Sequence, residues 1–274
     1  MPPLTSLAEV TSAAEKGDAK SQTDLGLRYE TGSGVIMDAK AAASWYQKAA
    51  NQGYALAQKN LGVLYANGRG VPRDDVVAVK WYNKAAEKGL AQAQYNLGFM
   101  YSNGRGVAKD FDEAARWYRK AAEQGLPEAQ YNLGVIYEKG IGVPRDLKAS
   151  ADWCRRAAEQ GFAQAQHNLG VKYDTGQGIG QNLIEAARSY RSAAEQGIAE
   201  SQFNLGMMFF KGQGVTKDYV EAYKWIFLAA AQGEPNAVRG RDLLNQGLSR
   251  EQIKEAQQRA AAFVPKKPPI PSAQ

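Results

Sequence analysis

The chain has 274 residues, 44% of them hydrophobic, and carries 34 Lys and Arg against 28 Asp and Glu, a net charge of +6. It has no run of about 18 apolar residues, so the sequence excludes a transmembrane helix and no membrane insertion is expected. A single cysteine, Cys154, excludes an intrachain disulfide. Basic and acidic residues are interspersed, so we interpret the charge as a solvated face, with an acidic partner as the alternative.

The N-terminal segment, residues 1–17, is predicted to form a cap. It lacks a basic region followed by an apolar core, so no signal peptide is predicted and a cytoplasmic chain is expected. If a leader has been removed, the expected location is periplasmic or secreted. Ala13-Ala14 and Gly17 fall in phase with Ala49-Ala50 and Gly53 of the following unit. Residues 1–17 therefore correspond to the second half of a truncated repeat.

Residues 18–233 contain six copies of one unit with a period of 36 residues, the separation of Leu25 from Leu61. In five copies a tyrosine follows the repeated leucine four residues later, and Phe209 takes its place in the sixth. A Leu-Gly pair occurs in every copy, at Leu25-Gly26, Leu61-Gly62, Leu97-Gly98, Leu133-Gly134, Leu169-Gly170 and Leu205-Gly206. A fixed period of this length predicts stacked hairpins, because no single unit can bury its own apolar face.

Each unit is predicted to form two helices, as the third copy, Ala91–Gly125, illustrates. Leu97 and its apolar neighbours lie at helical spacing in the first half. Gly98 lies inside this helix at a cost of about 1 kcal/mol relative to alanine, so we expect a neighbouring helix to approach its backbone closely. Asp110 is predicted to cap the second helix, and Trp117 is expected in the apolar stripe of that helix.

The repeat decays after residue 233, where Arg241 stands at the expected position of the leucine. Ser249 and Gln252 match the capping pattern of a last helix that ends near Phe263. Residues 234–264 are therefore predicted to form C-terminal capping helices over the sixth hairpin. Residues 265–274, PKKPPIPSAQ, are proline-rich and are predicted to be a disordered tail.

The six copies share the pattern A-x-A-Q-x-N-L-G-x-x-Y-x-x-G-x-G-V-x-x-D-x(4)-A-x-x-W-Y-x-K-A-A-x-x-G. Over residues 13–233 this closely resembles the Sel-one-like repeat (SLR) family, which is related to tetratricopeptide repeats. The resemblance implies an all-α fold, a right-handed α/α superhelix (solenoid) of six hairpins with N- and C-terminal capping helices. It also implies a non-catalytic adaptor or scaffold that binds a peptide or protein partner in the concave groove of a solenoid.

Two other functions stay open on the sequence. One bacterial branch of SLR proteins has a disulfide in each repeat and is linked to β-lactam binding, which suggests a β-lactam-binding or peptidoglycan-linked hydrolase as the alternative. The single Cys154 departs from that branch. A nucleic-acid binder would rely on the charge of +6 and would lose affinity steeply with salt. We expect no nucleic-acid partner, and a monomer that binds protein.

Three sequence features invite a chemical role. In the six Gly-x-Gly loops, valine or isoleucine follows the second glycine, whereas a nucleotide-binding loop has lysine and Ser or Thr there. His167 is the only histidine and holds a position that varies between copies, so no metal site is predicted. Cys154 stands where neighbouring copies have tyrosine, which indicates a small core residue and predicts that tyrosine is tolerated there. We therefore predict no catalytic residue, no metal and no cofactor.

The first helices carry candidate partner-binding positions on the face that stacking leaves open, so we expect these side chains to be at least partly exposed. One position is asparagine in five successive copies, and aromatic or bulky residues flank it. The candidates are Asn60, Tyr95, Asn96, Phe99, Tyr131, Asn132, His167, Asn168, Phe203, Asn204 and Met207. The asparagines would bond the backbone of an extended peptide, while the aromatic residues would supply contact area. The alternative is that each asparagine fixes its helix against the preceding repeat.

Overall fold

The computed structural model describes residues 6–266, and every regular element among them is an α-helix. The all-α class predicted from the repeat is therefore confirmed. These residues divide into two compact units, one ending at residue 129 with the addition of 141–143, the other consisting of 130–140 and of 144 onward. Within residues 6–266, no helix combines the length and the apolar character needed to span a membrane.

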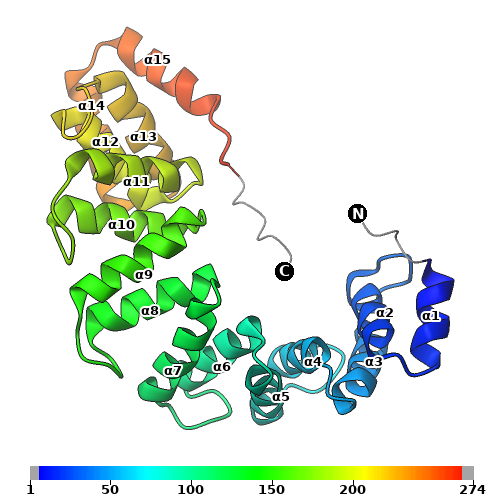
Figure 1. The fold of residues 1–274 in the computed structure, drawn as a ribbon. Coiled ribbons are helices and arrows are strands. Elements are labelled where there is room, and N and C mark those ends of the chain that lie inside the picture. Colours follow the sequence, from blue (N-terminus) through cyan, green and yellow to red (C-terminus); the bar gives the residue numbers. More distant parts are fainter. Residues whose placement is uncertain (1–5, 267–274) are drawn as a thin grey trace. The chain divides into compact units, whose positions relative to one another are not determined.

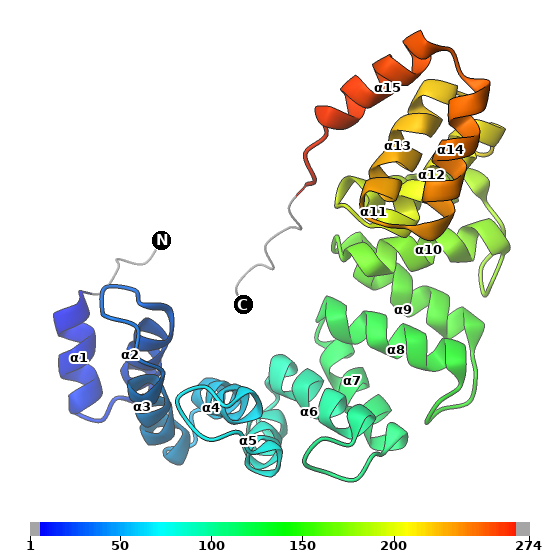
Figure 2. The same cartoon turned by 180° about the vertical axis from the view of Figure 1, so that it is seen from behind.

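The first unit contains α1 (Leu7–Glu15), α2 (Ala19–Thr31), α3 (Ala39–Asn51), α4 (Ala55–Asn67), α5 (Asp75–Glu87), α6 (Ala91–Asn103), α7 (Phe111–Glu123) and the start of α8 (Pro127–Lys139) (Figure 1). The second contains the rest of α8, α9 (Leu147–Glu159), α10 (Ala163–Thr175), α11 (Leu183–Glu195), α12 (Ala199–Lys211), α13 (Tyr219–Ala231), α14 (Pro235–Gly247) and α15 (Arg250–Ala261) (Figure 2). Hairpins form between α2 and α3, α4 and α5, α6 and α7, α10 and α11, and α12 and α13.

The helix boundaries follow the capping chemistry of the sequence. In the third copy, α6 ends at Gly104, whose φ of 65° lies in the left-handed region that glycine tolerates. Asp110 then caps α7, and its side chain accepts a hydrogen bond of 3.0 Å from the backbone nitrogen of Glu113. An aspartate or asparagine that accepts such bonds begins the second helix of every copy.

The tyrosine of the second helix is the centre of the hairpin core. Tyr46 is 0% exposed, and its hydroxyl donates a hydrogen bond of 2.8 Å to Glu30 of the same copy. The close approach expected at Gly98 is present, because a Cβ there would lie 2.9 Å from the ring of Tyr118. The repeated glycine thus makes room for the tyrosine ring of its own hairpin.

The tryptophan beside this tyrosine is less deeply buried than the tyrosine. Trp117 is only partly buried, against the side chains of the preceding copy. Lys120 Nζ lies 4.2 Å from the centroid of its ring, and Lys48 lies over Trp45 at 3.8 Å in the same way. The ring is thus covered on one side by the array and on the other by a lysine that solvent reaches. Trp117 thus packs against the apolar cluster as expected, but at its edge rather than fully inside it.

From the second copy onward, the Gly-x-Gly loops lock each copy to the one before it. A Cβ on Gly178, in the loop between α10 and α11, would lie 1.9 Å from the carbonyl oxygen of Leu147 at the start of α9. In the third copy Arg105 adds a charged bond, with Nη2 at 2.6 Å from Asp75 Oδ1. Hydrogen bonds from Arg105, and then from Arg73, lower the pKa of Asp75 to about 2.

Buried glutamines join successive copies, a feature that the sequence analysis did not single out. Gln94 Nε2 donates a hydrogen bond of 3.2 Å to the carbonyl of Ala86 in the preceding copy, and Gln124 Nε2 donates one of 2.7 Å to Gln94 Oε1. The same glutamine pair recurs as Gln52–Gln22, Gln160–Gln130, Gln196–Gln166 and Gln232–Gln202. Gln94 is buried whereas Gln124 is exposed, so these bonds satisfy the amide of Gln94, which packing has removed from water.

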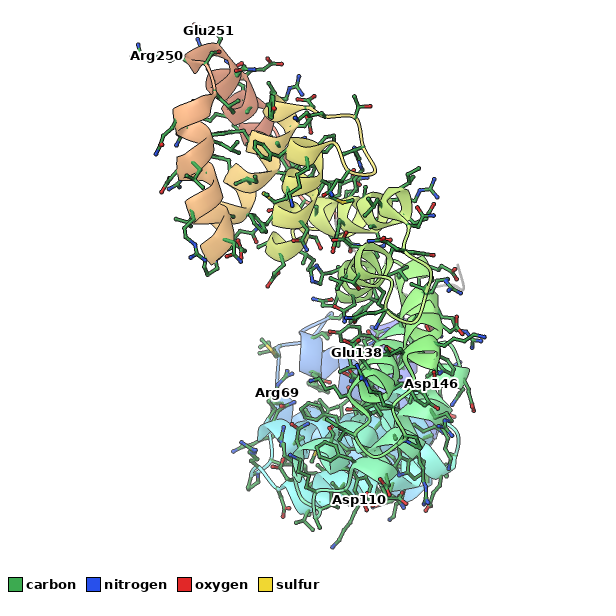
Figure 3. All side chains as sticks on the ribbon, turned by 90° about the vertical axis from the view of Figure 1, so that its left-hand side faces the viewer. Arg69, Asp110, Glu138, Asp146, Arg250 and Glu251 are labelled. Atoms are coloured by element: carbon green, nitrogen blue, oxygen red, sulfur yellow. The ribbon has the colours of Figure 1, made fainter. Side chains whose placement is uncertain are left out.

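The C-terminal helices α14 and α15 both pack against α13. Ser249 and Gln252 form the capping box that the sequence predicts at the start of α15, beside Arg250 and Glu251 (Figure 3). After α15 the chain reaches back to α11, where the backbone nitrogen of Lys266 donates a hydrogen bond of 2.7 Å to the carbonyl of Glu195. Residues 267–274 of the predicted tail lie outside the described residues.

Candidate functional site

The candidate partner-binding residues all keep part of their surface exposed. Those of the first unit are Asn60, Tyr95, Asn96 and Phe99. Those of the second unit are Tyr131, Asn132, His167, Asn168, Phe203, Asn204 and Met207. Each lies on a first helix of its copy, and Phe99 is the most open of the aromatic candidates, with 39% of its surface exposed.

The asparagines bond to tyrosines of the array. The side chain of Asn60 hydrogen-bonds to Tyr46, on the second helix of the preceding copy, and Asn204 bonds to Tyr190 in the same way. Asn168 bonds to the hydroxyl of Tyr131, on the first helix of the preceding copy. In these three copies the asparagine therefore holds its helix against the preceding repeat, which was the alternative to peptide binding.

The aromatic candidates next to these asparagines are supported by ring contacts. The ring of Tyr95 lies 5.6 Å from that of Tyr118, between centroids, and Tyr131 lies 5.4 Å from Phe162. Phe203 packs against the buried cluster around Ile226. Part of each ring thus belongs to the packing between helices, and only the remainder faces outward.

His167 has a partner within the second unit. Its Nδ1 lies 2.8 Å from Ser201 Oγ, and its ring lies 5.9 Å from that of Tyr190. Burial lowers the pKa of His167 below its usual value of 6.5, so the ring is neutral at pH 7. Ser201 is 0% exposed, and four other copies have alanine at its position. A substrate cannot reach this serine, so the pair holds helices together rather than forming a nucleophile and base.

Cys154 is buried and replaces the core tyrosine of the fourth copy. Burial raises the pKa of its thiol to about 12, so the thiol stays protonated at neutral pH and is a poor nucleophile. Its Sγ lies 3.1 Å from the carbonyl oxygen of Ala165. Nearby, Lys172 is 3% exposed, and its Nζ lies 2.7 Å from Glu138, which is labelled at the end of α8 in Figure 3.

No group of three or more His, Cys, Asp or Glu side chains among residues 6–266 is arranged to hold a metal ion. The loop valines, which stand where a nucleotide site would need polar residues, pack inward instead. Val71, Val107 and Val215 each contact a buried cluster. The Gly-x-Gly loops therefore use their shape to join repeats.

The Sel1 repeat pattern matches the chain over residues 19–54, 55–90, 91–126, 127–162, 163–198 and 199–234. The chain belongs to the Sel1 repeat family. It is similar to the structure of a protective antigen of uropathogenic Escherichia coli strains that displays an SLR fold, with 40% identity and a TM-score of 0.85 over 93% of this chain and 56% of the antigen. The chain thus spans a little over half the length of that antigen.

A Sel1 repeat protein from Oxalobacter formigenes is similar as well, with 33% identity and a TM-score of 0.72 over 81% of this chain and 89% of the other. No curated protein sequence matches the chain. The resemblance to the SLR family, based on six copies in phase, is therefore confirmed.

The sequence analysis missed the pairing of unusual residues within this Sel1 repeat chain. Ser201 replaces the alanine that four other copies have at this position. The residue that it contacts in the preceding copy is the unusual His167. Lys172 is a lysine at the position that Met100 holds in the third copy. The copy that precedes Lys172 is the one in which Cys154 replaces the tyrosine. A search for departures that coincide in neighbouring copies would have found both pairs.

The His167–Ser201 pair predicts a dependence of stability on pH. Because the folded pKa of His167 is lowered, the unfolded chain binds more protons as the pH falls below about 6.5, and stability decreases until the folded pKa is reached. We expect the double variant His167→Tyr/Ser201→Ala, which copies the Tyr131–Ala165 pair, to flatten this dependence. Urea midpoints of both proteins between about pH 8 and pH 5.5 measure it, and equal slopes would contradict the assignment, since His167 is the only histidine.

Proposed function

We propose that this Sel1 repeat protein is a non-catalytic adaptor that binds a peptide or protein partner on the exposed face of its first helices. The strongest support is a contrast between the residues that join the helices, which are repeated, and an outward position of the first helices, which varies. The glycine and glutamine that join helices recur in every copy, whereas one outward position holds Lys59, Tyr95, Tyr131, His167 and Phe203 in turn. A regular frame sets the spacing of contacts, and the varied side chains supply specificity.

The partner-binding contacts that we propose are mainly apolar. In the first unit, Phe99 is 39% exposed on α6, and Tyr95 lies one helical turn before it with its ring supported by Tyr118. An apolar ring that solvent reaches and that a rigid neighbour holds in place is a suitable anchor for a partner side chain. The asparagines, which bond to tyrosines in several copies, then position this face rather than contact the partner directly.

The variant Phe99→Ser tests this proposal. We expect it to fold normally, because exposed substitutions change stability by about 0.5 kcal/mol or less, and to retain at least about tenfold less of the partner. Val76→Ser is the matched control, since Val76 is 51% exposed in the same unit but lies on the second helix α5. Tyr95 and Tyr131 are left intact because their loss would also remove ring packing.

The measurement is quantitative mass spectrometry of proteins retained from an extract of the source organism by each immobilised protein. Proteins that wild type and Val76→Ser retain equally, and that Phe99→Ser loses, support the first-helix face as the binding site. Equal retention by all three proteins would show that this face is not used. Circular dichroism of the three proteins verifies that the comparison is made between folded chains.

A further inference from the structure

The end of the chain's own last helix covers a tryptophan in the second unit. Trp225 is 3% exposed, and Phe263, just after α15, packs edge-on against it at 5.4 Å between ring centroids. Arg259 Nη1 lies 2.7 Å from Glu221 Oε1. Lys266 pairs with Glu195 through both its side chain and its backbone nitrogen. The end of α15 and the residues after it therefore bind to one tryptophan and two carboxylates, which lie on α13 and α11.

The residues on the helix end have a defined spacing. Arg259 lies in the last turn of α15, Phe263 follows four residues later just beyond the helix end, and both contact α13. Lys266 follows three residues after Phe263 in the extended chain. A hollow of about 310 Å³ lies among these residues and their partners on α11 and α13. The contact thus combines an arginine, an aromatic ring and a lysine on one side with two glutamates and a tryptophan on the other.

The receiving residues recur 108 residues earlier, which is three repeats of 36, within the first unit. Glu87, Glu113 and Trp117 stand at the positions of Glu195, Glu221 and Trp225. We call these three residues the Trp117 surface. The local ion pair also recurs. Arg116 bonds to Glu113 at 2.6 Å, and in the second unit Lys224 bonds to Glu221 at 3.2 Å.

The neighbouring tryptophan offers a comparison within the same unit. At the positions of the two glutamates, the Trp81 copy has Asn51 and Val77. A hollow of about 800 Å³ beside Trp81 provides space, lined also by Tyr65 and Tyr101. Trp81 therefore offers a similar ring and an open hollow with no carboxylate at either equivalent position. Glu87, which also lines this hollow, lies on the same helix as Trp81.

We propose that the Trp117 surface is a second docking site, which binds a helix end of a partner protein that carries arginine, an aromatic residue four positions later and lysine three positions after that. Charge complementarity supports this partner, because two carboxylates from successive second helices face two cations at the spacing seen on α15. Trp117 is partly buried against a cluster of the preceding copy and its own, and it supplies the ring that the partner's aromatic residue contacts. The site is separate from the first-helix face of the proposed function.

The residue next to the tryptophan ring differs between the two sites. Lys120 Nζ lies 4.2 Å over the ring of Trp117, whereas the equivalent residue of the second unit is Leu228, which packs against the buried cluster there. Lys120 is exposed and flexible, so it can swing away when an aromatic residue approaches. It adds a like charge near the incoming cations, however, and so weakens the contact relative to a leucine.

The test uses a fluorescent peptide with the sequence of residues 249–266, titrated with the full chain and followed by anisotropy. We expect saturable binding that Trp117→Ala weakens at least about tenfold, while Trp81→Ala changes it by less than about twofold. The double variant Glu87→Gln/Glu113→Gln is expected to weaken binding and to reduce its dependence on salt. Lys120→Leu is expected to strengthen binding, a gain that a merely destabilised protein would not produce.

Other results would overturn the proposal. If Glu221→Gln abolishes binding and Trp117→Ala does not, the peptide only displaces the chain's own helix end. If the peptide lacking the ring, Phe263→Ala, binds as well as the original, the contact is not specific. If light scattering shows a dimer that Trp117→Ala dissociates, the occupant is a second copy of the chain. Absence of saturable binding by the folded wild-type chain would also reject the proposal.

Discussion

Replacing Gly178 by alanine is expected to open the loop between α10 and α11 away from α9, while the same change at Gly176 leaves the loop in place. Both glycines belong to one loop and have nearly equal φ angles, 73° and 76°. A Cβ at Gly178 would overlap the carbonyl oxygen of Leu147 at 1.9 Å. A Cβ at Gly176 would meet its nearest atom at 3.6 Å, which is ordinary contact.

The two variants therefore share the cost of a left-handed backbone and differ in the cost of overlap with the preceding copy. The left-handed backbone costs an alanine about 1–2 kcal/mol at either position. The overlap at Gly178 adds about 1–3 kcal/mol or more, because the obstacle is backbone that cannot rotate away. The overlap comes from the preceding copy, since the equivalent glycine of the first loop, Gly34, follows a truncated repeat and has no atom within 4 Å.

Hydrogen exchange is the suitable measurement, because neighbouring repeats of an array open locally and a single free energy of unfolding is not guaranteed. In Gly178→Ala the amides of α9 to α11 should exchange through a much more frequent opening than in Gly176→Ala. The urea midpoint should fall in the same order. Equal effects of the two variants would mean that strain in the loop alone, without contact to the preceding copy, governs the result.

The frame of this protein was predictable because it depends on short-range rules that are repeated in every copy. The period located the helices, the aspartates located their starts, and Gly98 indicated a close approach that Tyr118 supplies. Which of two adjacent apolar residues is the more deeply buried was not predictable in this way. Trp117 and Tyr118 both suit a helix facing a core, and only the packing of the neighbouring copy decides that the tyrosine is buried and the tryptophan only partly buried.

The candidate site was harder to predict because recurrence has two possible causes. An asparagine that bonds a tyrosine and one that bonds a ligand would both recur at the same position. Asn60 and Asn204 show the first cause, through bonds to Tyr46 and Tyr190 that depend on the distance between two helices of different copies. The sequence pattern contains no information on that distance. It does reveal where one copy departs from the others, and such departures identify the residues whose surroundings have changed.

Cys154→Tyr is expected to destabilise the second unit strongly when it is made alone, and to be rescued by Lys172→Met. The repeat pattern suggests that tyrosine is tolerated at this position, because adjacent copies contain it. In the first copy the hydroxyl of Tyr46 bonds to Glu30, and in the fourth copy the equivalent Glu138 is bonded by Lys172 instead. Lys172 thus takes the hydrogen-bonding role that the missing tyrosine would have.

The two residues are therefore coupled, and their substitutions should not add. A tyrosine opposite the buried Lys172 overfills the core, at about 1–3 kcal/mol, and displaces a charged amine from its carboxylate. Lys172→Met alone should be close to neutral, because Glu138 is partly solvated and a buried ion pair contributes little net stability. Methionine is the residue of two other copies at this position, Met100 and Met208.

The double variant copies the pairing of Tyr82 with Met100 and of Tyr190 with Met208. Gly134 still leaves room for the tyrosine ring. The tyrosine hydroxyl would then bond to Glu138 as Tyr46 bonds to Glu30. We expect an interaction energy of about 1–3 kcal/mol in a double-mutant cycle, the range found for residues in contact. Urea denaturation and hydrogen exchange of α8 to α10 in the four proteins measure it. Additive effects would show that Lys172 and Cys154 became unusual independently, and that a tyrosine in the fourth copy finds its space without displacing the lysine.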